Sequence, residues 1–181
     1  MRVRLISGRY GGRFLDAPGT DRTHPMGERI RGSLFNILGD VSGMTVLDAF
    51  AGSGAVGLEA LSRGAAHVTF IERDRIAQRV LAENIKLLGA QHQTSLIRTS
   101  VASWSQTATA QRFDLIIADP PYHDLQLSTV GRLVAYMQPN GLMILSHSGR
   151  ESVSTVNGVV VVDKRSYGDA ALAFYRPSTS N

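Results

Sequence analysis

The feature that most constrains the fold is an apolar run, Met44–Phe50, that leads directly into a glycine-rich loop over residues 52–57, with the sequence GSGAVG. Glycine allows the backbone to turn tightly after a buried strand and to approach a ligand closely. A second apolar run, His67–Ile71, follows a helical segment and ends in Glu72. This order predicts a parallel α/β sheet whose ligand lies beyond the carboxyl ends of its strands.

The rest of the chain continues the alternation of strands and helices. Helical spacing of apolar residues predicts helices over residues 27–38, 74–88 and 125–137, and apolar runs predict strands over 94–98, 113–118 and 142–147. Two closing strands, 159–165 and 170–175, are expected to pair as an antiparallel hairpin, and a smaller hairpin is expected around Gly8–Arg13. These elements predict a doubly wound, mostly parallel seven-stranded α/β sheet with a small N-terminal β-hairpin extension.

The glycine loop alone does not identify its ligand, because it also matches the fingerprint of NAD- and FAD-binding proteins. Asp48 stands four residues before the first loop glycine, at the tip of the predicted strand. A carboxylate there repels a pyrophosphate but attracts the ammonium and sulfonium groups of S-adenosylmethionine. Glu72 is placed to accept hydrogen bonds from ribose hydroxyls. The sequence favours S-adenosylmethionine, although a structural Asp48 that binds loop amides would be compatible with either ligand.

A second motif, Asp119-Pro120-Pro121-Tyr122, follows the strand predicted over residues 113–118. The Asp119 carboxylate and the Pro120 carbonyl can each accept one N–H of an exocyclic amine. The two prolines stiffen the turn, because each has a fixed φ and lacks an N–H. The Tyr122 ring offers a flat surface to an unstacked base. The motif therefore predicts Asp119, Pro120 and Tyr122 as the catalytic residues of a methyltransferase that acts on the amino group of a nucleobase.

Positive charge is concentrated at the N-terminus. The chain has a net charge of +4, and residues 1–31 alone hold seven arginines against three acidic residues, whereas residues 32–181 are balanced. Arginine binds phosphate groups bidentately and stacks on bases. We therefore expect residues 1–26 to form a basic, RNA-contacting extension of a catalytic part that spans residues 27–181, although a charged stretch is more often simply a solvated surface.

Composition also excludes several kinds of protein. Cysteine is absent, which rules out disulfides and thiolate metal sites, and no His and carboxylate residues show metal-ligand spacing. No apolar run approaches the ~20 residues of a membrane span, and the N-terminus lacks an apolar block of signal-peptide length. We expect a soluble, cytoplasmic monomer without a bound metal.

Almost from end to end, the chain resembles the bacterial 16S rRNA guanine-N2 methyltransferases that modify the small ribosomal subunit. The combination of an arginine-rich helix, this glycine loop and an Asp-Pro-Pro-Tyr turn is far more restrictive than the loop alone. The resemblance is carried by Ser7-Gly8 with Gly11-Gly12-Arg13, Glu28–Arg31 with Ser33–Leu38, Val46–Gly54, Gly57–Ala65, Ile71–Asp74, Phe113–Tyr122 and Tyr167–Asp169.

The resemblance implies a Rossmann-like class I methyltransferase fold, S-adenosylmethionine as the methyl donor, and N2 of a guanine in 16S rRNA as the acceptor, within an assembling small subunit. It places the target base at the Asp-Pro-Pro-Tyr turn. The donor is expected at Asp48, Ala51, Gly52, Ser53, Gly54, Glu72, Arg73, Ser100, Val101 and Asp119. The basic N-terminal segment adds predicted RNA contacts at Arg9, Arg13, His24, Arg29 and Arg31.

The sequence departs from the family pattern at three places. The Arg-Pro-Thr that is usual in the N-terminal loop is His24-Pro25-Met26 here, and a glutamate that is usual in the following helix is Gly32. The acidic residue that often contacts the adenine amine in related enzymes is Ser100 or a neighbour. These changes bear on RNA docking and adenine recognition more than on methyl transfer.

Two other functions remain open. An adenine-N6 or cytosine-N4 nucleic-acid methyltransferase would use the same four-residue turn, because the turn can accept hydrogen bonds from any exocyclic amine. A non-catalytic RNA-binding assembly factor would retain the fold, although the intact glycine loop and Asp119 disfavour it. The length of the chain leaves little room for a separate DNA-recognition domain.

Overall fold

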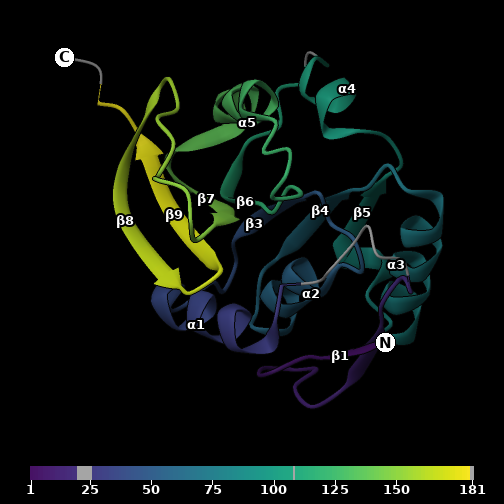
Figure 1. The fold of residues 1–181 in the computed structure, drawn as a ribbon. Coiled ribbons are helices and arrows are strands. Elements are labelled where there is room, and N and C mark those ends of the chain that lie inside the picture. The colour runs from purple at the N-terminus through teal and green to yellow at the C-terminus, as the bar shows by residue number, and fades with distance from the viewer. Residues whose placement is uncertain (20–25, 108, 180–181) are drawn as a thin grey trace.

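The structure is a computed structural model of the chain and describes residues 1–19, 26–107 and 109–179. Its centre is a seven-stranded sheet with the strand order β5-β4-β3-β6-β7-β9-β8 (Figure 1). Five strands are parallel: β3 (Thr45–Ala49), β4 (His67–Ile71), β5 (Thr94–Ile97), β6 (Phe113–Ala118) and β7 (Met137–Ser148). The antiparallel strands are β8 (Val159–Tyr167) and β9 (Ala170–Pro177). The predicted mostly parallel sheet with its C-terminal hairpin is confirmed.

Helices cover both faces of this sheet (Figure 1). Three helices lie on one face and two short ones on the other: α1 (Glu28–Leu38), α2 (Ala55–Ser62) and α3 (Arg75–Leu87) on the first, α4 (Val101–Ser105) and α5 (Leu127–Leu133) on the second. Successive side chains of a strand point to opposite faces, so Val46 packs into the core under the first group and Leu47 into the core under the second. None of the described helices is long and apolar enough to cross a membrane.

Two expectations about the second half of the chain are wrong. The helix expected over residues 125–137 ends at Leu133, and a 3-10 turn over Val134–Tyr136 leads into β7 at Met137. β7 runs through Pro139, which was expected to lie between helix and strand. The register between β6 and β7 is irregular at this point. Pro139 lacks an N–H, but no hydrogen bond between the two strands depends on it. The short helix α4 was not expected.

The predicted N-terminal hairpin is present. β1 (Arg2–Arg4) and β2 (Phe14–Asp16) pair antiparallel in a two-stranded sheet of their own. The hairpin lies beside α2 and α3 in Figure 1, and the fully buried side chains of Leu5 and Leu15 belong to the same core cluster as the residues of α1 and α2. The extension therefore shares its hydrophobic core with the large sheet.

A buried carboxylate on α2 joins the hairpin to the rest of the molecule. Glu59 is fully buried, and its two carboxylate oxygens accept hydrogen bonds from the amides of Ile6 at 2.9 Å and Ser7 at 3.1 Å. The guanidinium of Arg63 donates to the same carboxylate at 2.8 Å, and that of the buried Arg31 on α1 forms an ion pair with it at 3.8 Å. One side chain thus connects the hairpin, α1 and α2.

The loop of the hairpin also rests directly on the end of α2. The amide of Arg9 donates to the Ser62 carbonyl at 2.7 Å, and the Ser62 hydroxyl donates to the Ser7 carbonyl at 2.6 Å. Gly8 lies between these contacts with φ of +82°, and a Cβ placed on it would lie 1.9 Å from the Ser62 carbonyl oxygen. The backbones approach so closely here that only glycine fits.

We expect Gly8→Ala to lower the free energy of unfolding by more than Gly12→Ala does. Both glycines have a positive φ, +82° and +84°, so alanine adds a similar backbone strain of about 1–2 kcal/mol at either site. Only at Gly8 does the new Cβ also meet main-chain atoms, whereas at Gly12 it meets open space. Chemical denaturation should therefore find Gly8→Ala less stable than Gly12→Ala by about 1–3 kcal/mol. Equal stabilities would contradict the docking described here.

Candidate active site

The parallel register of the sheet brings three carboxylates to one rim. Ala49 at the end of β3 pairs with Ile71 on one side and with Ala118 on the other, so the three strands end level with one another. Glu72 and Asp119 follow two of these strand ends directly, and Asp48 lies one residue before the third. Burial is the main reason why the pKa of Asp48 is raised, and the charges of Asp119 and Glu72 add to it. The structure thus brings three residues that were predicted at the donor site to the carboxyl edge of the sheet.

Asp48 is almost fully buried at the start of α2. Its Oδ2 accepts a hydrogen bond from the amide of Gly57 at 2.9 Å. Burial raises the pKa of Asp48 well above its usual range, and the Gly57 amide acts in the opposite direction. Asp48 therefore has the structural role that the sequence left open. A dinucleotide would place its pyrophosphate at the N-terminus of α2. The Asp48 carboxylate already lies there, and this disfavours a dinucleotide.

Glu72 fixes the glycine loop to the beginning of α3. One of its carboxylate oxygens accepts the amide of Gly52 at 2.7 Å, and the other accepts the amide of Asp74 at 2.8 Å. Asp74 in turn caps α3 by accepting the Ala77 amide at 2.8 Å. Each Glu72 oxygen has a second lone pair. Glu72 is therefore able to accept a ribose hydroxyl while it continues to hold the loop.

Phe50 is a feature of this rim that the sequence did not reveal. It follows β3 with φ of +62°, a conformation that is strained for a bulky side chain. The ring is partly buried and packs against the core cluster that contains Val101 and Trp104. Strain of this kind costs about 1–3 kcal/mol and clusters at functional sites. An aromatic residue between a buried strand and a glycine loop is the only sequence signal that could have drawn attention to it.

Ser100 and Val101, predicted at the donor site, begin helix α4. The Ser100 hydroxyl caps this helix by accepting the Ser103 amide at 3.0 Å. Val101 is buried beside Trp104 in the second core cluster. Ser100 thus replaces an acidic residue with a helix cap, and its contact with the donor stays a prediction.

The Asp-Pro-Pro-Tyr turn holds a partly exposed carboxylate beside a tyrosine. Desolvation raises the pKa of Asp119 to about 6, and the hydroxyl of Ser146 acts in the opposite direction. That hydroxyl also lies 2.9 Å from the phenol oxygen of Tyr122, which is anchored by this contact. Ser146 is buried on β7 and was not predicted as a site residue. Its only sequence signal is a hydroxyl at the end of an apolar run.

The two prolines of the turn differ in what their carbonyls do. The carbonyl of Pro121 accepts the amide of Asp124 at 2.9 Å and so closes the turn. Within the described ranges, no donor is hydrogen-bonded to the carbonyl of Pro120. The Pro120 carbonyl therefore has both lone pairs available next to the Asp119 carboxylate.

Asn84 connects the N-terminal hairpin to the glycine loop, another link that sequence reasoning missed. The side chain is buried on α3, and its Oδ1 accepts the Asp16 amide at 3.0 Å. Its Nδ2 donates to the Asp16 carbonyl at 2.9 Å and to the Ser53 carbonyl at 3.0 Å. No sequence signal could have identified this residue, because an asparagine in a helix is usually exposed.

One of the predicted RNA contacts is wrong. Arg31 is fully buried, with its Nη1 donating to the Met26 carbonyl at 3.0 Å, its Nη2 to the Arg4 carbonyl, and its Nε paired with Glu59. Burial lowers the pKa of Arg31, and the charge of Glu59 opposes this effect. Because its guanidinium is sealed inside the protein, Arg31 holds the fold together and does not reach a phosphate.

The other predicted RNA contacts lie at the surface or outside the described residues. Arg9 and Arg13 are exposed on the hairpin, and Arg29 is exposed on α1. Arg13 also donates to the Leu87 carbonyl at 2.9 Å, which ties the hairpin to the end of α3. His24 lies outside the described residues. RNA binding by Arg9, Arg13 and Arg29 stays a prediction.

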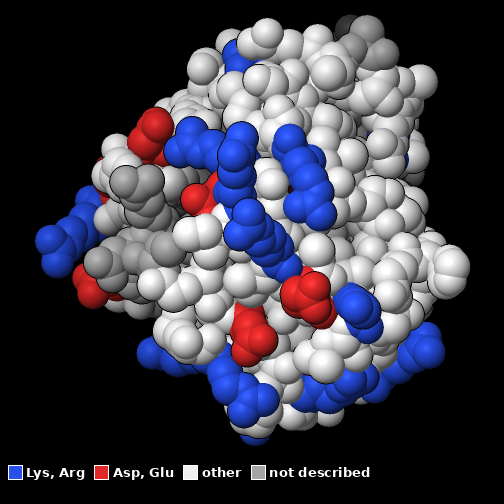
Figure 2. All heavy atoms as spheres, turned by 90° about the vertical axis from the view of Figure 1, so that its right-hand side faces the viewer, with Lys and Arg blue, Asp and Glu red and all other residues white. Residues whose placement is uncertain are grey.

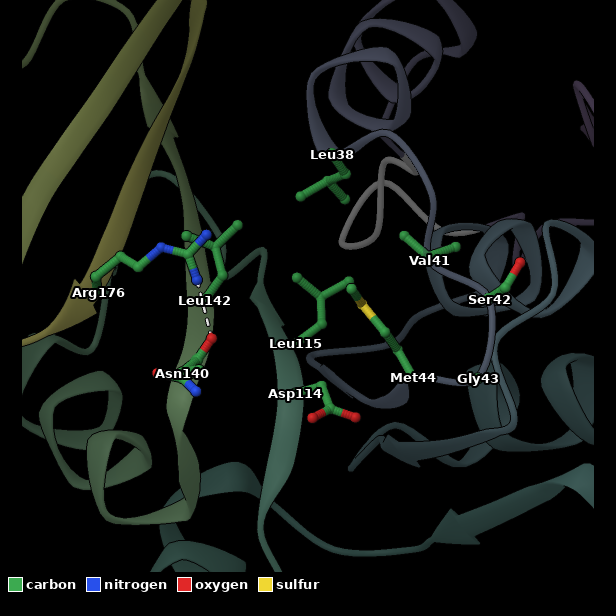
Figure 3. A pocket seen from close by; sticks show the side chains of 10 residues that line it. All are labelled: Leu38, Val41, Ser42, Gly43, Met44, Asp114, Leu115, Asn140, Leu142 and Arg176. Carbon is green, nitrogen blue, oxygen red and sulfur yellow. Dashed lines mark hydrogen bonds between the residues drawn. The ribbon is translucent and has the colours of Figure 1, made fainter.

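A cavity of about 330 Å³ lies away from this rim, at the amino ends of β3 and β6 (Figure 3). The apolar side chains of Leu38, Met44 and Leu115 point into it, and the guanidinium of Arg176 is held at its edge by a 2.9 Å hydrogen bond to the Asn140 carbonyl. None of the predicted site residues lines it. The described residues include no group of three or more His, Asp or Glu side chains that could hold a metal ion.

Known proteins share this architecture over nearly the whole chain. The family described as conserved hypothetical protein 95 matches residues 3–176. YlbH of Bacillus subtilis is 34% identical over 182 residues, which cover 96% of this chain and 98% of YlbH. The ribosomal RNA small subunit methyltransferase D of Haemophilus influenzae is 28% identical, over 96% of this chain and 93% of its own.

Among solved structures, yhhF from Escherichia coli superimposes with a TM-score of 0.88 at 29% identity and covers 99% of this chain and 100% of its own. The match of the family over residues 3–176 includes the glycine loop, Glu72 and the Asp-Pro-Pro-Tyr turn. The chain therefore belongs to this family, that of the bacterial small-subunit (16S) rRNA methyltransferases.

Proposed function

We propose that the protein transfers a methyl group from S-adenosylmethionine to N2 of a guanine in 16S rRNA. The observation that supports this most directly is the convergence of Asp48, Glu72 and Asp119 at one rim. Three neighbouring carboxylates favour a cationic ligand. S-adenosylmethionine has an ammonium and a sulfonium group, and a dinucleotide has neither.

The turn at the end of β6 orients the acceptor amine. Asp119 and the Pro120 carbonyl each accept one N–H of the guanine amino group, which directs the nitrogen lone pair towards the methyl group. When bound, S-adenosylmethionine would supply the electrophilic methyl group on its sulfonium, and the bond to sulfur would be exchanged for the bond to the amine nitrogen. No strong base is required beforehand, because the methylated amine is a cation that loses its proton readily. The residues of the chain therefore act through orientation and charge placement.

Tyr122 supports the base after it leaves its stack. Unstacking costs a few kcal/mol, and stacking on an aromatic ring returns about 1–3 kcal/mol of it. The phenol oxygen of Tyr122 is held by Ser146 at 2.9 Å, while 37% of the residue's surface remains exposed. A ring that is fixed at one end and open on its surface is suited to this role.

The function is tested by incubating the protein with labelled S-adenosylmethionine and either small ribosomal subunits, naked 16S rRNA or duplex DNA. Nucleoside analysis of the product identifies the acceptor. N2-methylguanosine in rRNA supports the proposal, N6-methyladenosine or N4-methylcytidine supports the other class of amino-methyltransferase, and no transfer at all supports a non-catalytic assembly factor.

We expect Asp119→Asn to lower methyl transfer by at least about 100-fold, because a neutral amide has one acceptor oxygen in place of two and lacks the charge that strengthens the hydrogen bond to the amine. The affinity for S-adenosylmethionine, measured by calorimetry, should change by no more than a few-fold. Asp40→Asn is the matched control, because Asp40 is an exposed carboxylate whose contact is with the Ser42 amide. Full activity of Asp119→Asn would remove this side chain from the mechanism.

The same substitution should stabilise the protein at neutral pH. The pKa of Asp119 is about 6 in the folded chain, against an ordinary value of 3.8. Above pH 6 the carboxylate is ionised in the folded chain and lowers its stability. Below pH 4 it is protonated in the folded and the unfolded chain, and this destabilisation disappears. Asp119→Asn should therefore raise Tm by about 2–6 °C at pH 7.5. Calorimetric scans should show this gain shrinking towards pH 4. A gain that is independent of pH would contradict the elevated pKa.

A further inference from the structure

The outer face of α3 presents three basic side chains in a single row. Arg75, Arg79 and Lys86 are spaced four and seven residues apart, which places them within about 40° of one another around the helix axis. All three are exposed, and the buried residues of α3 lie on other sides of the helix. We call this row the α3 basic stripe.

The side chains of the α3 basic stripe form no ion pair in the described part of the chain, although Glu83 is exposed beside Arg79 on the same helix. Residues 73–98 hold five basic residues against two acidic ones, whereas residues 32–72 hold one basic residue against four acidic ones. Where the chain is described, no carboxylate forms an ion pair with any of the three stripe side chains. By contrast, Arg31 and Arg63 are paired with Glu59. The stripe is thus available to an external anion.

The α3 basic stripe connects two parts of the molecule that the proposed function requires. At its C-terminal end, Arg13 of the hairpin donates to the Leu87 carbonyl at 2.9 Å. At its N-terminal end, α3 begins at Arg75, three residues after Glu72 at the rim of the candidate active site, and Arg98 is exposed directly after the neighbouring β5. Figure 2 shows this face, on which Lys and Arg side chains gather in the middle and along the lower edge, with acidic side chains between the two groups.

We propose that the α3 basic stripe binds the phosphates of the rRNA strand next to the target guanine and guides this strand from the hairpin to the active-site rim. This inference rests on the proposed function. The stripe is about 16 Å long, enough for several consecutive phosphates. Arginine holds phosphate bidentately, and its charge contributes without reading the base sequence. Its position between the basic hairpin and the base-binding turn favours a nucleic acid over a membrane surface.

The test compares a stripe variant with a variant that loses the same charge elsewhere. The stripe variant is R75Q/R79Q/K86Q, and the control is R112Q/K164Q/R176Q, whose residues are exposed before β6, on β8 and on β9. Binding of 16S rRNA is measured between 50 and 300 mM KCl by filter retention, roughly the range over which phosphate contacts dominate the salt dependence. Thermal unfolding with and without S-adenosylmethionine confirms that both variants fold and bind the donor.

We expect the slope of log Kd against log salt to fall by about 2 in the stripe variant, since each lost phosphate contact removes about 0.7–0.9. Its Kd at 100 mM salt should rise at least about tenfold, while kcat at saturating rRNA stays unchanged. The control variant should keep the slope of the wild type. An unchanged slope, or equal losses in both variants, would overturn the inference.

Two further outcomes separate this inference from the proposed function. If the wild type methylates no RNA but the slope still falls in the stripe variant, the proposed function fails and the stripe remains an RNA-binding surface. If the wild type methylates rRNA and the stripe variant instead loses only binding to phosphatidylserine vesicles, the stripe is a membrane surface and the inference is wrong.

Discussion

The buried carboxylate of Glu59 is the interaction on which the arrangement of this molecule depends. It accepts two amides of the N-terminal hairpin and balances the charges of Arg31 and Arg63. A buried charge that loses its partner costs several kcal/mol, so neither Glu59 nor Arg31 can be exchanged alone without penalty. Since α2 begins at the glycine loop, the same helix that anchors the hairpin at its far end shapes the candidate donor site at its near end.

The candidate active site is assembled at the expense of stability. Parallel strands that end in register bring Asp48, Glu72 and Asp119 together, and burial, with a further contribution from the two neighbouring charges, raises the pKa of Asp48. Phe50 adds a strained backbone at the same rim. Functional sites commonly contain strain and like charges that a stable fold would otherwise avoid. A cationic ligand relieves the electrostatic part of this cost, which fits a donor with two positive groups.

Much of the fold was predictable because it follows from local patterns. The strands over His67–Ile71 and Phe113–Ala118 have the expected boundaries, since a continuous apolar run is typical of a strand that is buried on both faces. The carboxylates at the rim were predictable for the same reason, because strand ends in a parallel sheet lie side by side. The course of β7 was not predictable, because its irregular pairing with β6 is a tertiary feature.

The side chains that sequence reasoning missed act over long distances along the chain. Ser146 meets Tyr122 from another strand, Asn84 meets both Asp16 and Ser53, and Arg31 turns inward to Glu59. Helical spacing cannot separate an arginine that faces solvent from one that is paired with a carboxylate 28 residues further along the chain. Only the packing of α1 against α2 decides between them.

Asn84 has a mechanical consequence for the whole N-terminal region. The side-chain amide of Asn84 forms hydrogen bonds with the main-chain N–H and carbonyl of Asp16 and with the carbonyl of Ser53. If the hairpin shifted outward, the buried side chain of Asn84 would lose its two hydrogen bonds to Asp16, at a cost of about 1–3 kcal/mol for each. Asn84 therefore couples the extension to the glycine loop, so that a displacement of the one strains the hydrogen bonds of the other.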